Sequence, residues 1–413
     1  MNIFSIRDLE PSEDTMASQS PTTIMVIGTG SGGSNAIDHF QDSGLSGVQF
    51  IAVNTDRQHL YCMSKAKTKL HIGSKLTGGR GAGGDPEKGE EAAKEDSEML
   101  RKTMKGADMV FLTTGMGGGT GTGSIPVIAN IAKESGALTV GVVTTPFEFE
   151  GPEKMQIAIE GIEKLREEVD TLIVIPNQNL YKMIVDRKTS FPKMLKYADE
   201  ILLQAVQGIS DLVTNTGHIN CDFADVEATM KGQGVAHLGI GCGTGENRVK
   251  DAVDGAIENP LLEDVSISGA SRLLVNIAGT EDIPAAEVKE ILEAIRAKAG
   301  KDAKMKFGIT YDPNLGENIK VTVIATGLNN ADIASEKEKD IQKNDTMEEW
   351  VEYAGFQAMK GIQNDKRQND NFGNYFKTSE DYKTIREIPA ISRMGATGEF
   401  IYGDKIAANG RDA

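Results

Sequence analysis

A glycine-rich run at residues 115–123 limits what this chain can fold into more than any other stretch. Its sequence is Gly-Met-Gly-Gly-Gly-Thr-Gly-Thr-Gly. The apolar residues 109–112 before it predict a buried parallel strand, and a helical pattern covers residues 127–132 after it. Glycines in a strand-to-helix turn let backbone N–H groups approach an anion closely, and Thr120 and Thr122 add hydroxyl donors. The run therefore predicts a phosphate-binding cradle rather than a merely flexible loop.

A second glycine-rich turn, at residues 28–35, supplies a rival hypothesis. It follows a predicted strand at 23–27 and precedes a helix that we expect from about Ala36. It also satisfies the dinucleotide pattern G-x-G-x-x-G, and Asp56, after a predicted strand at 48–53, is placed to contact a ribose in such a site. This hypothesis makes the chain an NAD-dependent oxidoreductase. The structural alternative is a plain helix N-cap at Thr55 or Asp56.

A third glycine-rich loop, at residues 78–85, favours a phosphate site of another kind. Pro86 opens a helix after it, which we expect to reach about Lys105. A dinucleotide fold uses one glycine fingerprint, so it gives no role to residues 81–84 or 117–123. The sequence also lacks G-x-x-x-x-G-K-[ST], which excludes a P-loop enzyme. Backbone dipoles and a metal ion would hold the phosphates instead.

The succession of strands, loops and helices predicts an α/β fold with a doubly wound parallel sheet and ligands at the carboxyl ends of its strands. A long helical pattern at residues 191–215 follows, and the later strands and helices predict a second α+β domain with a mixed sheet. We expect five parts, namely a flexible N-terminal arm (1–21), a phosphate-binding domain (22–190), a central connecting helix (191–216), a second domain (217–328), and a linker with a flexible C-terminal tail (329–413).

The net charge of the chain limits the classes of partner that it can bind. The net charge is −17 at pH 7 over 413 residues, which argues against a nucleic-acid binder and means that self-assembly needs screening by salt or divalent cations. The three cysteines and five histidines show neither a disulfide framework nor a zinc spacing. No apolar stretch is long enough to span a bilayer, and residues 1–21 are too polar for a signal peptide. We therefore expect a cytoplasmic protein without direct membrane insertion.

The cradle sequence carries a family resemblance. Gly-Gly-Gly-Thr-Gly-Thr-Gly at 117–123 resembles the signature of the tubulin superfamily, and residues 22–328 resemble the bacterial FtsZ family of filament-forming, cell-division GTPases. The resemblance implies GTP and GDP as ligands with Mg²⁺, head-to-tail self-assembly into division-ring filaments at mid-cell, and hydrolysis that depends on assembly. Residues 22–190 would then be the GTP-binding domain and residues 217–328 the GTPase-activating domain.

The resemblance also assigns nucleotide contacts to positions of this sequence. The loops facing the phosphates would contribute Gly30, Ser31, Gly32, Gly33, Asn35, Ala82, Gly83, Gly117, Gly118, Gly119, Thr120 and Gly121. Asp56 would lie near the phosphates and the metal, and Glu150 of the Phe-Glu-Gly segment would bind the ribose. Asn177 would contact the base or sugar, while Asp199 would accept the N1 and N2 donors of guanine. A carboxylate that accepts two donors favours guanine over adenine.

Three positions depart from the family pattern. Lys154 stands where an arginine usually helps to hold the nucleotide, and lysine keeps the charge but loses the planar fork. Ser31 replaces a usual glycine, and Leu195 stands where an aromatic residue often stacks on the guanine. These departures leave an alternative open, a nucleotide-bound filament scaffold with little hydrolysis.

The segment Asn-Cys-Asp-Phe-Ala-Asp at 220–225 resembles the family's synergy loop, which enters the nucleotide pocket of the next subunit. Asn220, Asp222 and Asp225 would complete the catalytic site, with the carboxylates positioning the attacking water. Helix capping by Asp222 is compatible with this role. Cys221 would lie in the subunit interface, so we expect its alkylation to block assembly and spare GTP binding.

Two short segments interrupt the polar C-terminal region. Residues 347–362 have helical spacing, and residues 387–393 partly resemble the tail peptide by which the family contacts membrane tethers. We therefore expect two kinds of partner: other copies of this chain, and tail-binding division or membrane-tether proteins.

Overall fold

The computed structural model describes residues 22–328, apart from residues 46, 184–188, 215–220, 259–266, 281 and 301. These residues belong to one contact unit, Met1–Glu349. The expected N-terminal arm (1–21), the expected tail (329–413) and Asn220 lie outside the described residues. Among the described residues, no helix combines the length and apolar character needed to cross a bilayer.

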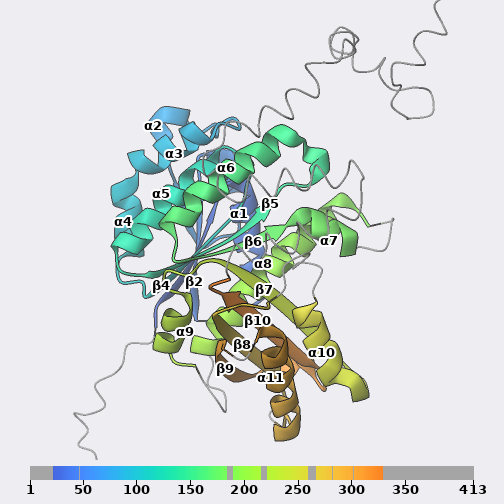
Figure 1. The fold of residues 1–413 in the computed structure, drawn as a ribbon. Coiled ribbons are helices and arrows are strands. Elements are labelled where there is room, and N and C mark those ends of the chain that lie inside the picture. Colours follow the sequence, from blue (N-terminus) through green and yellow to red (C-terminus); the bar gives the residue numbers. More distant parts are fainter. Residues whose placement is uncertain are drawn as a thin grey trace, which may run out of the picture. The chain divides into compact units, whose positions relative to one another are not determined.

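A ten-stranded sheet runs through the described part of the chain, in the order β3-β2-β1-β4-β5-β6-β7-β10-β8-β9 (Figure 1). The strands are β1 (Ile24–Thr29), β2 (Val48–Asn54), β3 (Thr68–His71), β4 (Met109–Gly115), β5 (Leu138–Thr145), β6 (Thr171–Pro176), β7 (Gly234–Gly243), β8 (Arg272–Gly279), β9 (Lys304–Tyr311) and β10 (Ile319–Thr326). The α-helices are α1 (Gly30–Asp42), α2 (Ser74–Thr77), α3 (Pro86–Glu95), α4 (Ser97–Met104), α5 (Thr120–Glu134), α6 (Pro152–Glu168), α7 (Asn177–Met183), α8 (Phe191–Thr214), α9 (Phe223–Met230), α10 (Arg248–Ile257) and α11 (Ala285–Ala299).

The first six strands are all parallel, which confirms the predicted doubly wound sheet. Their order, 3-2-1-4-5-6, is also the order of dinucleotide-binding folds, so the sheet alone does not separate the two hypotheses. The order reverses between β1 and β4, and ligands of such sheets bind where this reversal occurs. The glycine-rich turns at 28–35 and 115–123 therefore lie at the expected place.

Two apolar layers cover the faces of this sheet. Phe40 of α1 and Leu202 of α8 pack in one buried cluster, and helices α3–α6 supply the other, with Ile125 and Leu165. Because both faces are covered, β4 is buried along nearly its whole length, and this explains its uninterrupted apolar sequence. Figure 1 shows α4, α5 and α6 together on one side of the strands.

Helix α8 joins the two halves of the sheet. Its buried residues share one cluster with Phe40 of the first half and with Leu274 and Ile324 of the second. Gly208 allows this packing, because a Cβ there would lie 2.7 Å from the Thr322 side chain of β10. The predicted central helix is thus confirmed over the described residues, ending at Thr214.

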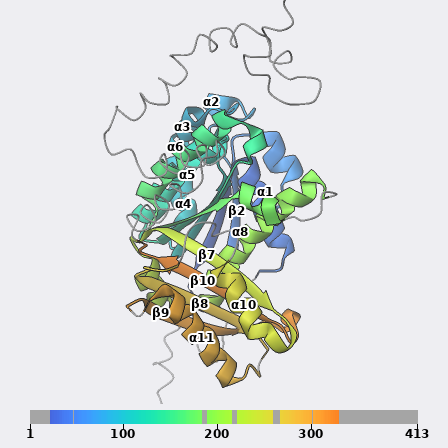
Figure 2. The ribbon, with the colours of Figure 1, turned by 45° about the vertical axis from the view of Figure 1, so that its right-hand side comes forward.

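The later strands form the predicted mixed sheet. Strand β10 is antiparallel to β7 and β8, β9 is parallel to β8, and α10 and α11 cover these strands (Figure 2). Strand β7 also pairs in parallel with β6 over three residues, so the sheet continues without interruption from the first half into the second. The sequence does not indicate this continuity.

The sequence-based bounds of three helices are wrong. The helix expected from Pro86 to Lys105 is divided into α3 and α4 at Asp96, whose φ and ψ are −107° and 22°. The Asp96 side chain accepts a hydrogen bond from Gly73 N at 2.7 Å, which ties the break to the end of β3. Helices α1 and α5 begin at Gly30 and Thr120, earlier than predicted, because their glycines belong to the first helical turns.

Candidate functional site

Two helix starts meet at the carboxyl ends of β1 and β4. Neither α1 nor α5 has a side-chain N-cap hydrogen bond, and neither has an acidic residue in its first turn. Helix α3 differs, because Asp85 caps it by accepting from the N–H groups of Glu87 and Lys88. The N–H groups at the starts of α1 and α5, together with the positive ends of both helix dipoles, are therefore suited to an anion.

The three glycine-rich loops converge because some of their glycines touch other backbones. A Cβ on Gly30, which has φ of +70°, would lie 2.8 Å from Gly121 N, and a Cβ on Gly121 would lie 2.1 Å from Thr114 Oγ1. A Cβ on Gly119 would lie 2.6 Å from Asp85 N, next to the third loop. No other residue would allow these approaches without a shift. These glycines hold the cradle together.

Other glycines of the same loops face open space. A Cβ on Gly118 or Gly83 would meet no protein atom within 4 Å. Gly32 and Ser31 are exposed at the start of α1, as is Asn35 one turn later, whereas Gly33 and Ala82 are buried. A ligand can reach the backbone at the open positions.

The two threonines of the central loop differ in their surroundings. Thr120 Oγ1 lies 2.5 Å from Thr55 Oγ1, so it links the start of α5 to the end of β2. Thr122 is buried and accepts a hydrogen bond from Gly117 N at 2.9 Å. Thr122 therefore braces the loop instead of facing an anion, contrary to the expectation from the sequence. Sequence reasoning considered Thr55 only as part of a capping segment; its position directly after β2 is the signal that could have found it.

Asp56 makes a capping contact and a loop contact. Its Oδ1 accepts a hydrogen bond from His59 N at 3.0 Å, which agrees with the N-cap alternative. An isolated antiparallel bridge pairs Asp56 with Arg80, and this bridge brings the third glycine loop against the end of β2. Asp56 thus lies beside the loops of the cradle.

The ends of β5 and β6 carry a second polar group of residues. Glu150 accepts from Phe147 N at 3.0 Å and pairs with Lys154 Nζ at 3.0 Å. A Cβ on Gly117, which has φ of +93°, would lie 2.7 Å from the Lys154 carbonyl oxygen, so this group adjoins the cradle. Asn177 is buried, and its Oδ1 has no hydrogen-bond partner among the described residues. A buried amide oxygen of this kind is suited to a ligand donor.

Asp199 lies near the start of α8, facing α1. Burial raises the pKa of its carboxyl to about 6, with a partly offsetting effect of His39 and a small further increase from Asp38. Leu195 and Tyr197, near the same helix start, are both exposed. The structure thus places Asp199 on the same side of the sheet as α1, where the base end of a bound nucleotide would lie if its phosphates met the cradle.

Asp222 and Asp225 lie elsewhere. Asp222 is the N-cap of α9 and accepts from Asp225 N at 2.7 Å, so the capping hypothesis is confirmed. The Asp225 carboxylate pairs with Lys306 Nζ of β9 at 2.6 Å. Helix α9 ends at the amino ends of the strands, since Met230 O accepts a hydrogen bond from the Thr171 hydroxyl at the first residue of β6. This end of the sheet is opposite to the cradle.

Cys221 is poorly suited to alkylation. It is buried, and this burial raises the pKa of its thiol to about 11, so the reactive thiolate is scarce at neutral pH. Cys62 and Cys242 are the exposed cysteines. The proposed blocking of assembly through alkylation of Cys221 in the native protein is therefore not a practical test.

Comparison with known proteins identifies the family. Residues 23–185 match the model of the Tubulin/FtsZ family GTPase domain, and residues 234–329 match that of the FtsZ family C-terminal domain. An FtsZ dimer from M. jannaschii, solved empty, is 44% identical to this chain, with a TM-score of 0.71 over 75% of this chain and 89% of that one. The chain belongs to the FtsZ family. CetZ1 from Haloferax volcanii, solved as a GDP-bound monomer, is 23% identical, with a TM-score of 0.66 over 76% of this chain and 97% of that one, and shows the same fold.

Family membership decides between the two interpretations of the glycine turn at 28–35. The chain carries a Tubulin/FtsZ-type GTPase domain, a family that binds GTP and GDP, and this overturns the oxidoreductase hypothesis. The residues present fit such a ligand, because two uncapped helix starts face the same open cradle and Asn177 offers an unpaired buried acceptor nearby.

Proposed function

We propose that this chain binds GTP at the cradle, assembles head to tail with copies of itself, and hydrolyses GTP at a site completed between two subunits. The observation that carries this proposal is the separation of the two halves of the site. The cradle lies at the carboxyl ends of β1 and β4, whereas α9, with Asp222 and Asp225, lies beyond the opposite end of the sheet.

The length of α8 gives a scale for that separation. Asp199 lies near its start, and Thr214 is at its end, where a Cβ on Gly47, next to the amino end of β2, would lie 3.3 Å from the Thr214 side chain. Fifteen residues of α-helix span about 22 Å at about 1.5 Å per residue. Asp222 and Asp225 lie at the amino ends of the strands, so we expect neither carboxylate to serve the cradle of its own subunit. They can serve the cradle of a neighbour stacked in the same orientation.

In the proposed site the nucleotide extends from the cradle toward α8. The phosphates would contact Gly30, Ser31, Gly32, Gly33, Asn35, Ala82, Gly83, Gly117, Gly118, Gly119, Thr120 and Gly121, with Asp56 nearby. Glu150 would bind the ribose, held by Phe147 N and Lys154, and Asn177 and Asp199 would recognise the base or sugar. A bound Mg²⁺ would neutralise phosphate charge. No cluster of three or more His, Cys, Asp or Glu side chains that could hold a metal is found among the described residues, so its ligands would come mainly from phosphate oxygens and water.

The neighbouring subunit would supply the hydrolytic carboxylates. Asp225 and Asp222, with Asn220 before them, would orient a water for attack on the terminal phosphate, which is the principal protein contribution to phosphoryl transfer besides charge stabilisation. When two different surfaces of the same chain bind each other and the repeated contact does not close into a ring, the copies form a filament. The similarity to an FtsZ dimer supports this self-association. We further propose a role in the division ring, with tail-binding division or membrane-tether proteins as partners.

Mixing two inactive variants tests the shared site directly. Asp225→Ala should keep nucleotide binding and lose hydrolysis, and Asp199→Ala should lose guanine binding but keep the carboxylates that it presents to a neighbour. An equimolar mixture with GTP and Mg²⁺ should recover part of the parent GTPase rate, because some interfaces join one intact cradle to one intact Asp225. Two inactive variants that stay inactive when mixed, although polymer pellets, would refute the shared site.

A concentration series separates the remaining alternatives. In the parent protein, GTPase activity per subunit should be absent below a threshold and appear together with pelletable polymer. Activity that does not change with concentration would mean that one chain carries the whole site. Polymer without hydrolysis would favour the filament scaffold, for which Ser31 and Lys154 are the departures from the family pattern.

A further inference from the structure

A hydrogen bond connects the helix of the proposed phosphate site to the helix of the proposed base site. His39 Nε2 of α1 lies 2.9 Å from Glu200 Oε2 of α8, and both side chains are partly exposed. Glu200 follows Asp199 directly, and its other oxygen accepts from Gln204 at 2.9 Å. The cradle glycines begin α1, nine residues or about 14 Å before His39 at about 1.5 Å per residue. The pair therefore joins the two ends of the nucleotide site.

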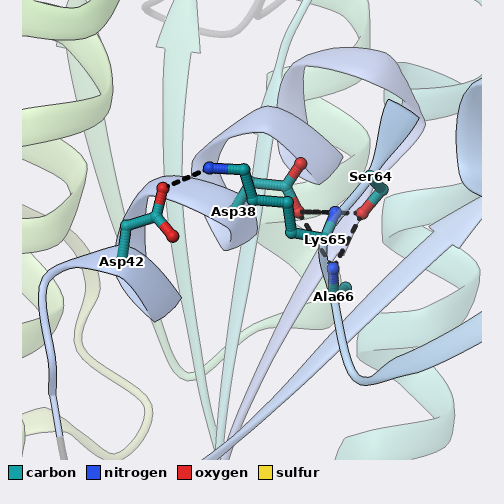
Figure 3. Close-up of polar contacts among 5 residues, drawn as sticks. All are labelled: Asp38, Asp42, Ser64, Lys65 and Ala66. Carbon is teal, nitrogen blue, oxygen red and sulfur yellow. Dashed lines mark hydrogen bonds and ion pairs between the residues drawn. The ribbon is translucent and has the colours of Figure 1, made fainter. Parts of the chain in front are cut away.

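A second set of contacts fixes α1 to residues 64–66, which precede β3. Asp38 Oδ1 accepts hydrogen bonds from Ser64 Oγ and Lys65 N, both at 2.8 Å, and from Ala66 N at 3.1 Å (Figure 3). Asp42 pairs with Lys65 Nζ at 2.6 Å. Asp38 is thus a fixed anion held by backbone donors, and His39 is the neighbouring group that turns toward α8.

We propose that His39 and Glu200 act as a positioning pair for Asp199, because their contact fixes the start of α8 against α1 and so sets where the Asp199 carboxylate meets the two guanine donors. This inference rests on the proposed nucleotide site and deepens it. His39 is a positioning residue, because it acts through Asp199 and needs no contact with the base.

The charges around Asp199 indicate that the His39–Glu200 pair affects the ionisation of Asp199 as well as the packing of α1 against α8. From α1, Asp38 and His39 act electrostatically on the Asp199 carboxyl. The charged neighbours of Asp199 on its own helix are Lys196 and Glu200. Asp38 disfavours the ionised carboxylate and His39 favours it. Loss of His39 removes the group that counters burial and Asp38, and loss of Glu200 removes the contact that fixes the imidazole against α8. The ionised carboxylate is the form that accepts two donors.

The ratio of two affinities tests this role. GDP and IDP differ by the 2-amino group of guanine, and diphosphates can be measured at low protein concentration to limit assembly. For the parent chain we expect tighter binding of GDP. In His39→Ala and Glu200→Ala the GDP-over-IDP preference should fall at least threefold, whereas a general loss of structure would weaken both nucleotides equally. The pH at which GDP binding is half lost should also rise in His39→Ala.

Asp42→Asn is the matched control, because it removes an ion pair of the same helix whose partner, Lys65, is not part of α8. It should leave the preference unchanged. Asp199→Asn should change the preference more than His39→Ala does. If Asp199→Asn changes it and neither His39→Ala nor Glu200→Ala does, although melting shows both folded, the positioning pair is refuted and the base site stands. A preference unaffected by Asp199→Asn would refute the base site and the pair together, and a parent chain that binds neither nucleotide would refute the proposed function.

Discussion

Asp199 is a carboxylate held in surroundings that oppose its charge. Burial between α1 and α8 raises its pKa from the ordinary 3.8 to about 6. Guanine donors would reverse this preference, because two N–H groups stabilise the ionised form. A residue that is unfavourable without its ligand and satisfied with it is typical of a binding site rather than of a structural ion pair.

This pKa predicts opposite pH effects on binding and on stability. Guanine nucleotide affinity should fall as the pH drops below about 6, since the protonated carboxyl cannot accept both donors. The stability that the neutral carboxyl gives the nucleotide-free fold is present below pH 3.8 and is lost as the pH rises through 6. Asp199→Asn should therefore stabilise the nucleotide-free protein at pH 7.5, by at most about 3 kcal/mol, and not at pH 4. Equal melting shifts at both pH values would contradict the assignment.

Helix α5 shows why one glycine-rich element has two kinds of glycine. Gly121 and Gly123 lie inside the helix, where a Cβ on Gly123 would lie 1.9 Å from the Pro86 carbonyl oxygen. Gly118, which precedes the first residue of α5, faces open space. The same residue type is therefore required by packing against α3 at one position and by ligand access at another.

A pair of alanine substitutions should separate these two requirements. Gly123→Ala should lower the free energy of unfolding by about 1–3 kcal/mol, because the helix must move away from α3. Gly118→Ala should leave the melting temperature nearly unchanged and weaken GDP at least tenfold, because its methyl group enters the cradle. Thermal melting and equilibrium binding of both variants provide the measurement. A Gly118→Ala protein with parent affinity would show that the nucleotide does not approach this residue.

The whole molecule is strongly acidic. With a net charge of −17, copies of the chain repel one another, and a filament brings many copies together. Because salt screens this repulsion, the Debye length being about 30 Å at 0.01 M and about 8 Å at 0.15 M, raising KCl across this range at constant Mg²⁺ should lower the protein concentration at which polymer first appears. Pelleting with GTP measures this threshold, and GDP is the control. A threshold that rises with salt would mean that attraction between unlike charges dominates the interface.

The sequence by itself determined the local elements and the chemistry of the cradle. Apolar runs such as residues 109–112 specified buried parallel strands because both faces of the sheet are covered, and the glycine-rich turns after them predicted an anion site at helix starts. Asp222 was predictable as a cap, since capping depends only on neighbours in the chain. The motif Gly-Gly-Gly-Thr-Gly-Thr-Gly indicated the family that the comparisons show.

Only the tertiary structure decided which residues far apart in the sequence contact one another. Gly121 is needed for packing and Gly118 for ligand access because different neighbours approach the two positions. The periodicity of the sequence does not predict these neighbours. The burial of Cys221 and Thr122, the break at Asp96 and the pairing of β6 with β7 likewise depend on neighbours far along the chain. The pairing of His39 with Glu200 joins residues 161 positions apart, so it exists only once α1 and α8 have packed.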